Sequence, residues 1–231
     1  MTLAPASRDA PLWVSVEGVN GVGKTSAVRA AAAMLGDRCV LLDELTDSGD
    51  EGLHGRVMAA LTEHGDPFLR NGHPVVETLA LLALQVGKPE RLAVGDLAGV
   101  DLVLEDRGVD SVAVYQAAIL CSEHPQTSAE SVARHILSGV QRWRHFPDAT
   151  LLLAGDVGEC ARRFADRIGQ PLTPADLRLL ERVDTLYRML AASDPSRFAV
   201  LEVAGMSLGE TVDAVGDFVA ALLDRKGAHV S

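Results

Sequence analysis

The sequence predicts an α/β fold in which a five-stranded parallel sheet is flanked by helices. Three observations support this: short runs that are apolar on both faces, helical segments between them, and a glycine-rich turn after the first run. Such alternation is typical of a parallel sheet that is covered on both sides and joined by right-handed crossovers. The predicted strands are 12–17, 39–44, 100–106, 149–155 and 198–205.

Eight segments with helical spacing and helix-forming residues separate and follow these strands. The sequence from Ser207 to Glu210 reads S-L-G-E, a capping box that predicts the start of the last helix. The chain has 231 residues and no repeat or long low-complexity linker, which favours one domain over 1–231. The predicted helices are 25–35, 52–63, 75–86, 109–121, 128–143, 157–165, 174–192 and 207–223.

The composition narrows the classes of partner. A formal net charge of −11 argues against a nucleic-acid polymer, because proteins that bind one usually present a basic surface. The sequence starts with no signal-like segment and contains no apolar run long enough to span a bilayer. Cys39, Cys121 and Cys160 are too scattered for a metal site and suit a reducing compartment. We therefore expect a cytoplasmic protein that binds neither nucleic acid nor membrane.

The glycine-rich turn fits the phosphate-binding pattern G-x-x-x-x-G-K-[ST], with a strand before it and a helix after it. Its backbone N–H groups would cradle phosphate oxygens, Lys24 would supply charge, and the hydroxyl of Thr25 would meet Mg²⁺. The pattern predicts a bound triphosphate with Mg²⁺ and leaves hydrolysis or transfer open. The predicted phosphate-binding residues are Gly18, Asn20, Gly21, Val22, Gly23, Lys24, Thr25 and Ser26.

The third predicted strand ends in an acidic residue followed by an arginine. Asp106 would lie at the same edge of the sheet as Thr25 and hold magnesium with it. Arg107 would clamp an anionic substrate or the phosphoryl group in transfer. The alternative is an ion pair that only stabilises the end of the strand.

Four segments resemble thymidylate kinases in order and spacing: VEGVNGVGKTS, EDRGVDSVAVYQ, FPDATLLLAGDVGECARRFADR and RFAVLEVAGMSLGE. The likeness extends from Trp13 to Leu223. It implies a three-layer P-loop kinase fold with a short arginine-containing lid, about 162–175. It also implies transfer of the γ-phosphate of ATP to a nucleoside monophosphate such as dTMP, with Mg²⁺, in a homodimer.

The resemblance also assigns roles to single residues. Asp106 corresponds to the family's magnesium-binding aspartate, and Arg107 to the arginine that approaches both phosphates. Tyr115 corresponds to a tyrosine near the substrate sugar, although a core aromatic on a helix would have the same pattern. Val22 stands where some members carry a catalytic arginine, which directs attention to the lid. There Arg162, Arg163 and Arg167 are the candidates, and Arg167 is the one we expect to act in catalysis.

The acceptor side departs from the family pattern. Asp43-Glu44-Leu45-Thr46 replaces Arg-Glu-Pro-Gly-Gly, and Asn20 stands where Asp or Glu is common. On the helix 75–86, Leu82 takes the place of the ring that stacks on thymine, and Gln85-Val86 replaces an Asp-Arg pair. The lost arginine leaves the acceptor phosphate without that cation, unless Lys88 or Arg91 substitutes.

These departures leave a second function open, a kinase that phosphorylates a hydroxyl of a nucleoside or other small metabolite. In that case Glu44 would be the general base that takes the proton of the hydroxyl group. A third candidate is an ATP-dependent switch or ATPase. A guanine-specific switch is excluded, because Gly155-Asp156-Val157-Gly158 follows the fourth strand instead of Asn-Lys-x-Asp. The lid arginines and the substrate-side helix argue against a switch.

Overall fold

The structure is a computed structural model that describes residues 10–47, 52–92, 97–122, 124 and 126–228. Its five strands form a single parallel sheet in the order β2-β3-β1-β4-β5, which confirms the predicted fold class. The strands are β1 (Leu12–Glu17), β2 (Cys39–Leu42), β3 (Leu102–Asp106), β4 (Ala149–Ala154) and β5 (Phe198–Glu202). The central strands are largely buried and consist mainly of Val and Leu, as a sheet covered on both faces requires.

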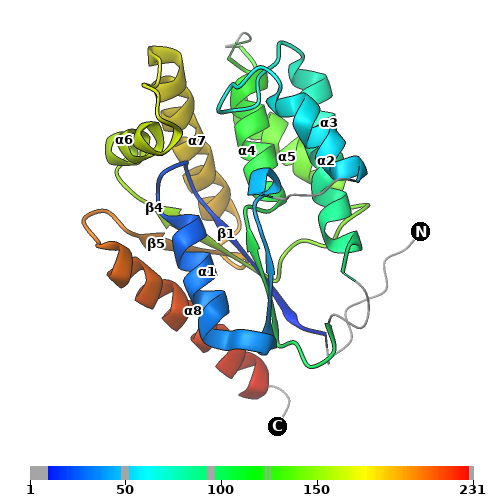
Figure 1. Ribbon diagram of the computed structural model, residues 1–231, viewed down its shortest axis with the longest axis vertical. Helices are drawn as coiled ribbons and strands as arrows, with labels where there is room; N and C mark the ends of the chain where they lie inside the picture. The colour runs from blue at the N-terminus through cyan, green and yellow to red at the C-terminus, as the bar shows by residue number, and fades with distance from the viewer. Residues whose placement is uncertain (1–9, 48–51, 93–96, 123, 125, 229–231) are drawn as a thin grey trace.

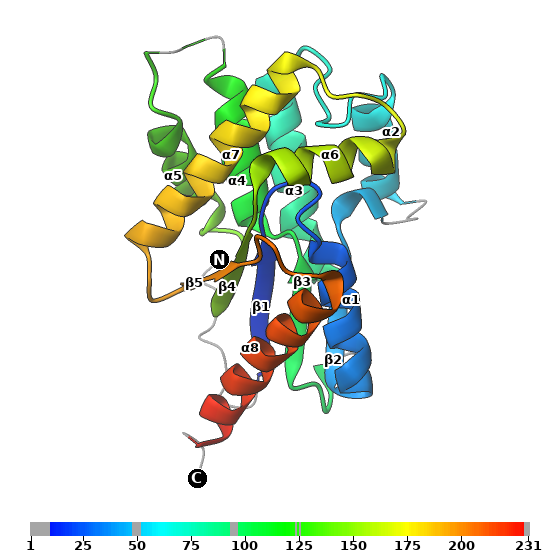
Figure 2. The same ribbon diagram turned by 90° about the vertical axis from the view of Figure 1, so that its left-hand side faces the viewer.

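Two helical layers enclose this sheet (Figures 1 and 2). Helices α1 and α8 cover one face, whereas α3, α4, α5 and α7 cover the other; α2 packs on α3, and α6 lies across one end of the sheet. None of the described helices is long and apolar enough to cross a lipid bilayer. The helices are α1 (Lys24–Leu35), α2 (Leu53–Thr62), α3 (Pro74–Glu90), α4 (Val109–Leu120), α5 (Ala129–Val140), α6 (Val157–Ile168), α7 (Pro174–Ser193) and α8 (Leu208–Ala228).

Helix α3 extends four residues past the predicted end at Val86 and contains Pro89 in its last turn. Proline has no N–H group, so the carbonyl of Gln85 four residues earlier loses its partner within the helix. Arg144 replaces that partner, because its Nη1 donates to the Gln85 carbonyl oxygen at 2.9 Å. A buried side chain from outside the helix thus allows α3 to continue through a proline.

The sheet register brings the candidate site together. β1 and β3 pair in parallel with Val16 opposite Asp106, so the ends of both strands meet at the same edge. The backbone N–H of Arg107 continues this pairing and donates to the carbonyl of Val16 at 3.2 Å. The glycine loop that follows β1 therefore lies beside Asp106 and Arg107, as expected for the carboxyl end of a parallel sheet.

Candidate active site

The glycine loop connects β1 to α1 and turns through three glycines of positive φ, Gly18, Gly21 and Gly23. Gly21 has a φ of +82°, and a Cβ there would clash with the carbonyl oxygen of Cys160 in α6. Only glycine fits that position. Val22 is buried in the packing behind the loop, whereas Ser26 is exposed in the first turn of α1. The loop is thus held closely against the first turns of α6.

The Lys24 ammonium group crosses this loop, and the residue is 4% exposed. Its Nζ donates to the carbonyl oxygens of Gly18 at 2.9 Å and Val19 at 2.8 Å. Burial, together with the charge of Arg107, outweighs the nearby carboxylates and lowers the pKa of Lys24 to about 7. A bound polyphosphate would favour the charged form and raise this pKa again.

Asp106 is a buried carboxylate. It is 1% exposed, and neither carboxylate oxygen has a hydrogen-bond partner among the described residues. The charges of Lys24 and Arg107 act on it from nearby, but a buried carboxylate without hydrogen bonds is costly unless a cation binds it directly. No group of three or more His, Cys, Asp or Glu side chains in the described part of the chain is placed to hold a metal. One carboxylate completed by phosphates and water is nevertheless how proteins usually hold Mg²⁺, so the residues present fit that ion.

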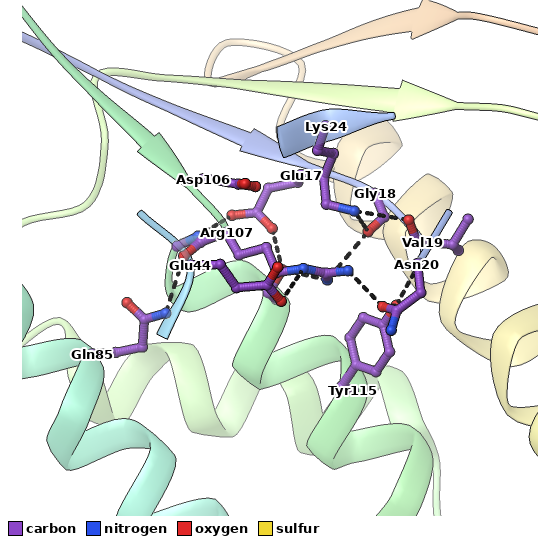
Figure 3. A network of polar contacts seen from close by, with 12 residues as sticks. Glu17, Gly18, Val19, Asn20, Lys24, Glu44, Gln85, Asp106, Arg107 and Tyr115 are labelled. Atoms are coloured by element: carbon purple, nitrogen blue, oxygen red, sulfur yellow. Dashed lines mark hydrogen bonds and ion pairs between the residues drawn. The ribbon is translucent and has the colours of Figure 1, made fainter. Parts of the chain in front are cut away.

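Arg107 lies at the centre of the site (Figure 3). Its Nε lies 2.7 Å from Glu44 Oε1 in an ion pair without a directed hydrogen bond. Its Nη2 donates to Asn20 Oδ1 at 2.5 Å, and its guanidinium carbon lies 5.3 Å from the centre of the Tyr115 ring. The side chain therefore joins the phosphate-binding loop to the residues that follow β2 and to helix α4.

Glu44 lies just beyond the end of β2 and is ionised. Burial alone would raise its pKa, but the charges of Arg107, Lys24, Arg167 and Lys88 together hold the pKa below its ordinary value. A carboxylate with a lowered pKa that is paired with an arginine is a weak acceptor for a substrate proton.

A cavity of about 100 Å³ opens beside Arg107, and Asn20 of the glycine loop forms part of its wall. Its apolar wall includes Phe68 and Leu81, and Tyr115 contributes a ring. Leu82, which the resemblance places at the stacking position, is not among the lining residues. The residues that line the cavity are Asn20, Glu44, Leu45, Thr46, Pro67, Phe68, Leu69, Leu81, Gln85, Arg107, Ser111, Val112, Tyr115 and Gln116.

Phe68 is a residue of this site that the sequence reasoning missed. Its ring lies between two others: the Tyr115 ring at 6.4 Å with a 26° interplanar angle, and the Phe164 ring at 5.6 Å, edge-on. Phe68 belongs to the segment between α2 and α3, where no periodic pattern marks a side chain as buried. The only sequence feature that could have indicated this role is an aromatic residue in a loop, and such a residue is common outside binding sites.

The three lid arginines differ in their partners. Arg162 pairs with Glu159 and Asp166, and Arg163 pairs with Glu159, on the exposed face of α6. Arg167 has no carboxylate partner among the described residues and lies over the Phe164 ring at 5.2 Å. Its charge contributes to the lowered pKa of Glu44. Arg167 is therefore the lid arginine whose charge is available to the site.

A phosphate-binding loop that faces a separate cavity across an arginine is the arrangement of a P-loop phosphotransferase, since transfer requires a second substrate beside the first. No protein-family model matches the chain. The thymidylate kinase of Cereibacter sphaeroides is 30% identical over 205 residues, which cover 84% of this chain and 87% of that one. The chain belongs to the thymidylate kinase family and is a nucleotide kinase.

Two further comparisons agree. The thymidylate kinase of Geobacter sulfurreducens is 29% identical over 224 residues, which cover 93% of this chain and 99% of that one. The crystal structure of thymidylate kinase from Ehrlichia chaffeensis superposes with a TM-score of 0.61 at 19% identity, covering 93% of this chain and 99% of that one. That structural likeness supports the fold.

Proposed function

We propose that this enzyme transfers the γ-phosphate of ATP to thymidylate or a closely similar nucleoside monophosphate. The observation that carries the proposal is the position of Arg107, between the glycine loop and the cavity. From that position its guanidinium can contact a phosphate on either side. Phosphoryl transfer requires positive charge on the oxygens of the group in transit and close alignment of donor and acceptor.

The residues that would hold Mg²⁺ are Asp106 and Thr25. The ion would neutralise phosphate oxygens and align them for transfer. Lys24 would leave the carbonyls of Gly18 and Val19 to bind the terminal phosphates, and the loop N–H groups would hold the others. Arg167 would add charge from the lid and exclude water.

One observation favours the alternative acceptor, a hydroxyl group. Glu44 already neutralises Arg107, which is the only arginine or lysine among the cavity-lining residues of the described chain. A dianionic monophosphate must therefore compete with Glu44 for the guanidinium group. We nevertheless rank this alternative second, because the lowered pKa of Glu44 opposes its use as a base. An ATP-dependent switch would have no use for the lined cavity.

We also propose that two copies associate through helix α3, as the family resemblance implies. Val75, Val76 and Leu79 are 60–64% exposed, and Leu79 follows the two valines at helical spacings of four and three, so they share one face. An exposed apolar stripe on a helix is typical of a surface that another protein covers. A two-fold dimer would pair this stripe with itself.

A coupled assay of ADP release with ATP and Mg²⁺ tests the function. Nucleoside monophosphates, nucleosides and unrelated hydroxyl compounds are offered in turn as acceptors. We expect dTMP or a related monophosphate to give the highest kcat/KM, and Lys24→Ala to abolish turnover. Activity confined to unphosphorylated acceptors would show that the second candidate is the correct one.

A further inference from the structure

Arg107 adopts a backbone conformation that few residues other than glycine adopt. Its φ is +58°, and among the described non-glycine residues only Leu69 shares a positive φ. A side chain in the left-handed region is strained and persists only where its surroundings hold it there. The conformation directs the Arg107 guanidinium to Glu44 and Asn20. The question is which groups hold the backbone.

The polar backbone groups of the 106–108 turn are bound by buried side chains. Lys88 Nζ donates to the carbonyl oxygens of Asp106 at 3.1 Å and Arg107 at 3.2 Å. Gln85 Nε2 donates to the same Arg107 carbonyl at 3.1 Å. On the other side, the N–H of Gly108 donates to Glu17 Oε1 at 2.7 Å. Two side chains of α3 thus hold the turn from one side, and the end of β1 holds it from the other.

Lys88 is not needed to balance the buried charge beneath the turn. Lys88 is 1% exposed and its ammonium group lies 3.2 Å from Glu105 Oε1, but Arg144 also pairs with Glu105. Burial alone would raise the pKa of Glu105, yet the two cations hold it below its ordinary value. One cation would be enough to neutralise one carboxylate. The remaining contacts of Lys88 are the two carbonyls of the turn.

Lys88 also cannot meet the acceptor directly. Its ammonium group is enclosed by Glu105 and the two carbonyls, and Lys88 is not among the residues that line the cavity. Gln85 reaches the cavity wall, but its amide N–H binds Arg107 and its amide oxygen accepts from Arg144 at 2.8 Å. The hydrogen bonds of both side chains to the Arg107 carbonyl therefore act on the site through the backbone of Arg107, in addition to the effect of the Lys88 charge on Glu44.

We infer that Lys88, assisted by Gln85, is a positioning residue that holds Arg107 in the left-handed conformation required to direct its guanidinium at the transferred phosphate. The inference rests on the proposed function, because it takes Arg107 to act on phosphate. In place of a cation that contacts the acceptor, α3 supplies a cation and an amide that hold the arginine already present.

The test is a double-mutant cycle between Lys88→Met and Arg107→Ala, with kcat/KM for the acceptor as the readout. In the wild-type background, Lys88→Met should lower kcat/KM by about 100-fold, the order expected for a misplaced catalytic group, with KM for ATP little changed. In the Arg107→Ala background the same substitution should cost at least about tenfold less than in the wild type, because only the contact of Lys88 with the Asp106 carbonyl remains to act on the site. Equal losses in both backgrounds would overturn the inference.

Trp13→Phe is the matched control. The Trp13 indole N–H donates to the same carboxylate, Glu105 Oε2, at 3.1 Å, and its described hydrogen bonds involve neither Gln85 nor the 106–108 turn, so this substitution should cost much less in kcat/KM than Lys88→Met. If Lys88→Met fails to fold, Gln85→Leu removes one hydrogen bond to the same carbonyl and enters the same cycle with a smaller expected loss.

A readout without substrate separates this inference from the proposed function. The amide N–H groups of Arg107 and Gly108 are both hydrogen-bonded, so their hydrogen exchange reports on the turn. Lys88→Met should accelerate exchange at these two amides, and Trp13→Phe should not. Unchanged protection in Lys88→Met would overturn the positioning role even if the enzyme used an unexpected acceptor. Failure of every acceptor in the wild type would instead overturn the proposed function alone.

Discussion

Asn20 and Tyr115 are joined by two hydrogen bonds through a single hydroxyl group. The Tyr115 hydroxyl donates to Asn20 Oδ1 at 2.6 Å and accepts from the Asn20 backbone N–H at 3.0 Å. Asn20 belongs to the glycine loop and Tyr115 to α4, and both side chains line the cavity. The donor and acceptor sides are thus connected by one phenol, and the neutral Asn20 side chain also accepts from Arg107.

Tyr115→Phe should weaken both sides together. The loss leaves the partly buried backbone N–H of Asn20 without its partner, whereas Asn20 Oδ1 still accepts from Arg107. An unpaired N–H costs about 1–3 kcal/mol, and at about 2–4 °C per kcal/mol Tm should fall by several degrees. KM for ATP and KM for the acceptor should both rise. Tyr187→Phe is the control, because its buried hydroxyl bonds Ser111 and Glu17 but not Asn20. A KM change limited to the acceptor would contradict the coupling.

Glu44→Gln distinguishes a charge partner from a general base. Loss of a general base costs about 10²–10⁴-fold in rate. If Glu44 serves mainly as the partner of Arg107, the Glu44→Gln enzyme should retain turnover within about tenfold, and its KM for the monophosphate should fall because the guanidinium is freed. Steady-state kinetics with dTMP and with the most active hydroxyl acceptor decide between these outcomes. A loss in kcat of about 10³-fold or more would establish Glu44 as the base.

The lowered pKa of Lys24 predicts proton uptake when ATP binds. In the enzyme without nucleotide, Lys24 has a pKa of about 7 and is mostly neutral at pH 8. A bound polyphosphate favours the ammonium form. Calorimetry at pH 8 in buffers of different ionisation enthalpy should reveal uptake of nearly one proton per site. ATP affinity should decline from pH 7 to 9, and Lys24→Arg should remove that decline, since arginine stays charged.

The same pKa fixes the sign of a stability effect without nucleotide. Between pH 7 and about 10 the unfolded chain binds the Lys24 proton more tightly than the folded chain does. The contribution of Lys24 to the free energy of unfolding therefore rises with pH across this window. Comparison of wild type with Lys24→Met by denaturant titration isolates the contribution. An identical pH dependence in the two proteins would contradict it.

Asp106→Asn should stabilise the protein while it abolishes catalysis. The substitution removes a buried charge that has no hydrogen-bond partner among the described residues, so the free energy of unfolding in EDTA should rise by about 1 kcal/mol. Turnover should fall by at least about 100-fold, because the amide is a poor ligand for Mg²⁺. Thermal unfolding with and without MgATP provides the check. An Asp106→Asn enzyme that is less stable and still gains the full Tm shift from MgATP would refute the metal role.

Leu79→Lys tests the dimer. Two positive charges facing each other across a two-fold interface should separate the copies, whereas Leu79 is 62% exposed within one copy and its replacement should leave the fold intact. Light scattering after size exclusion measures the mass. Leu208→Lys, at a 57% exposed site on α8, is the matched control. A monomeric wild type, or a Leu79→Lys variant that remains dimeric, would contradict the α3 interface.

The sequence predicted the sheet, the glycine loop and the Asp106-Arg107 edge because each depends on local pattern. Strands that are buried on both faces are continuous apolar runs, and the ends of parallel strands meet at one edge. The rotation of α3 about its own axis was harder to predict from the sequence. Neighbouring helical residues differ by about 100° in direction, so Leu81 lines the cavity where Leu82 was expected.

The positions of Gln85 and Lys88 depended on contacts that a single segment does not encode. Lys88 lies two residues beyond the predicted end of the helix at Val86, where a lysine usually reaches solvent. Glu105 from β3 and Arg144, which follows α5, alter both expectations by accepting the charge and binding the free carbonyl. The length of α3 and the burial of Lys88 therefore depend on residues from three distant parts of the sequence.

The close approach of Gly21 to Cys160 places the first turn of α6 directly against the glycine loop. Arg167 lies seven residues after Cys160 on the same helix, which at about 1.5 Å per residue is about 10 Å along the helix axis. A tilt of α6 by about 20° around Cys160 would move the backbone of Arg167 by about 4 Å. The phosphate loop would hardly move, while the guanidinium advanced or withdrew by more than the length of a hydrogen bond. A rotation of α6 about its contact with Gly21 would therefore change the distance from Arg167 to the site far more than it would move the glycine loop.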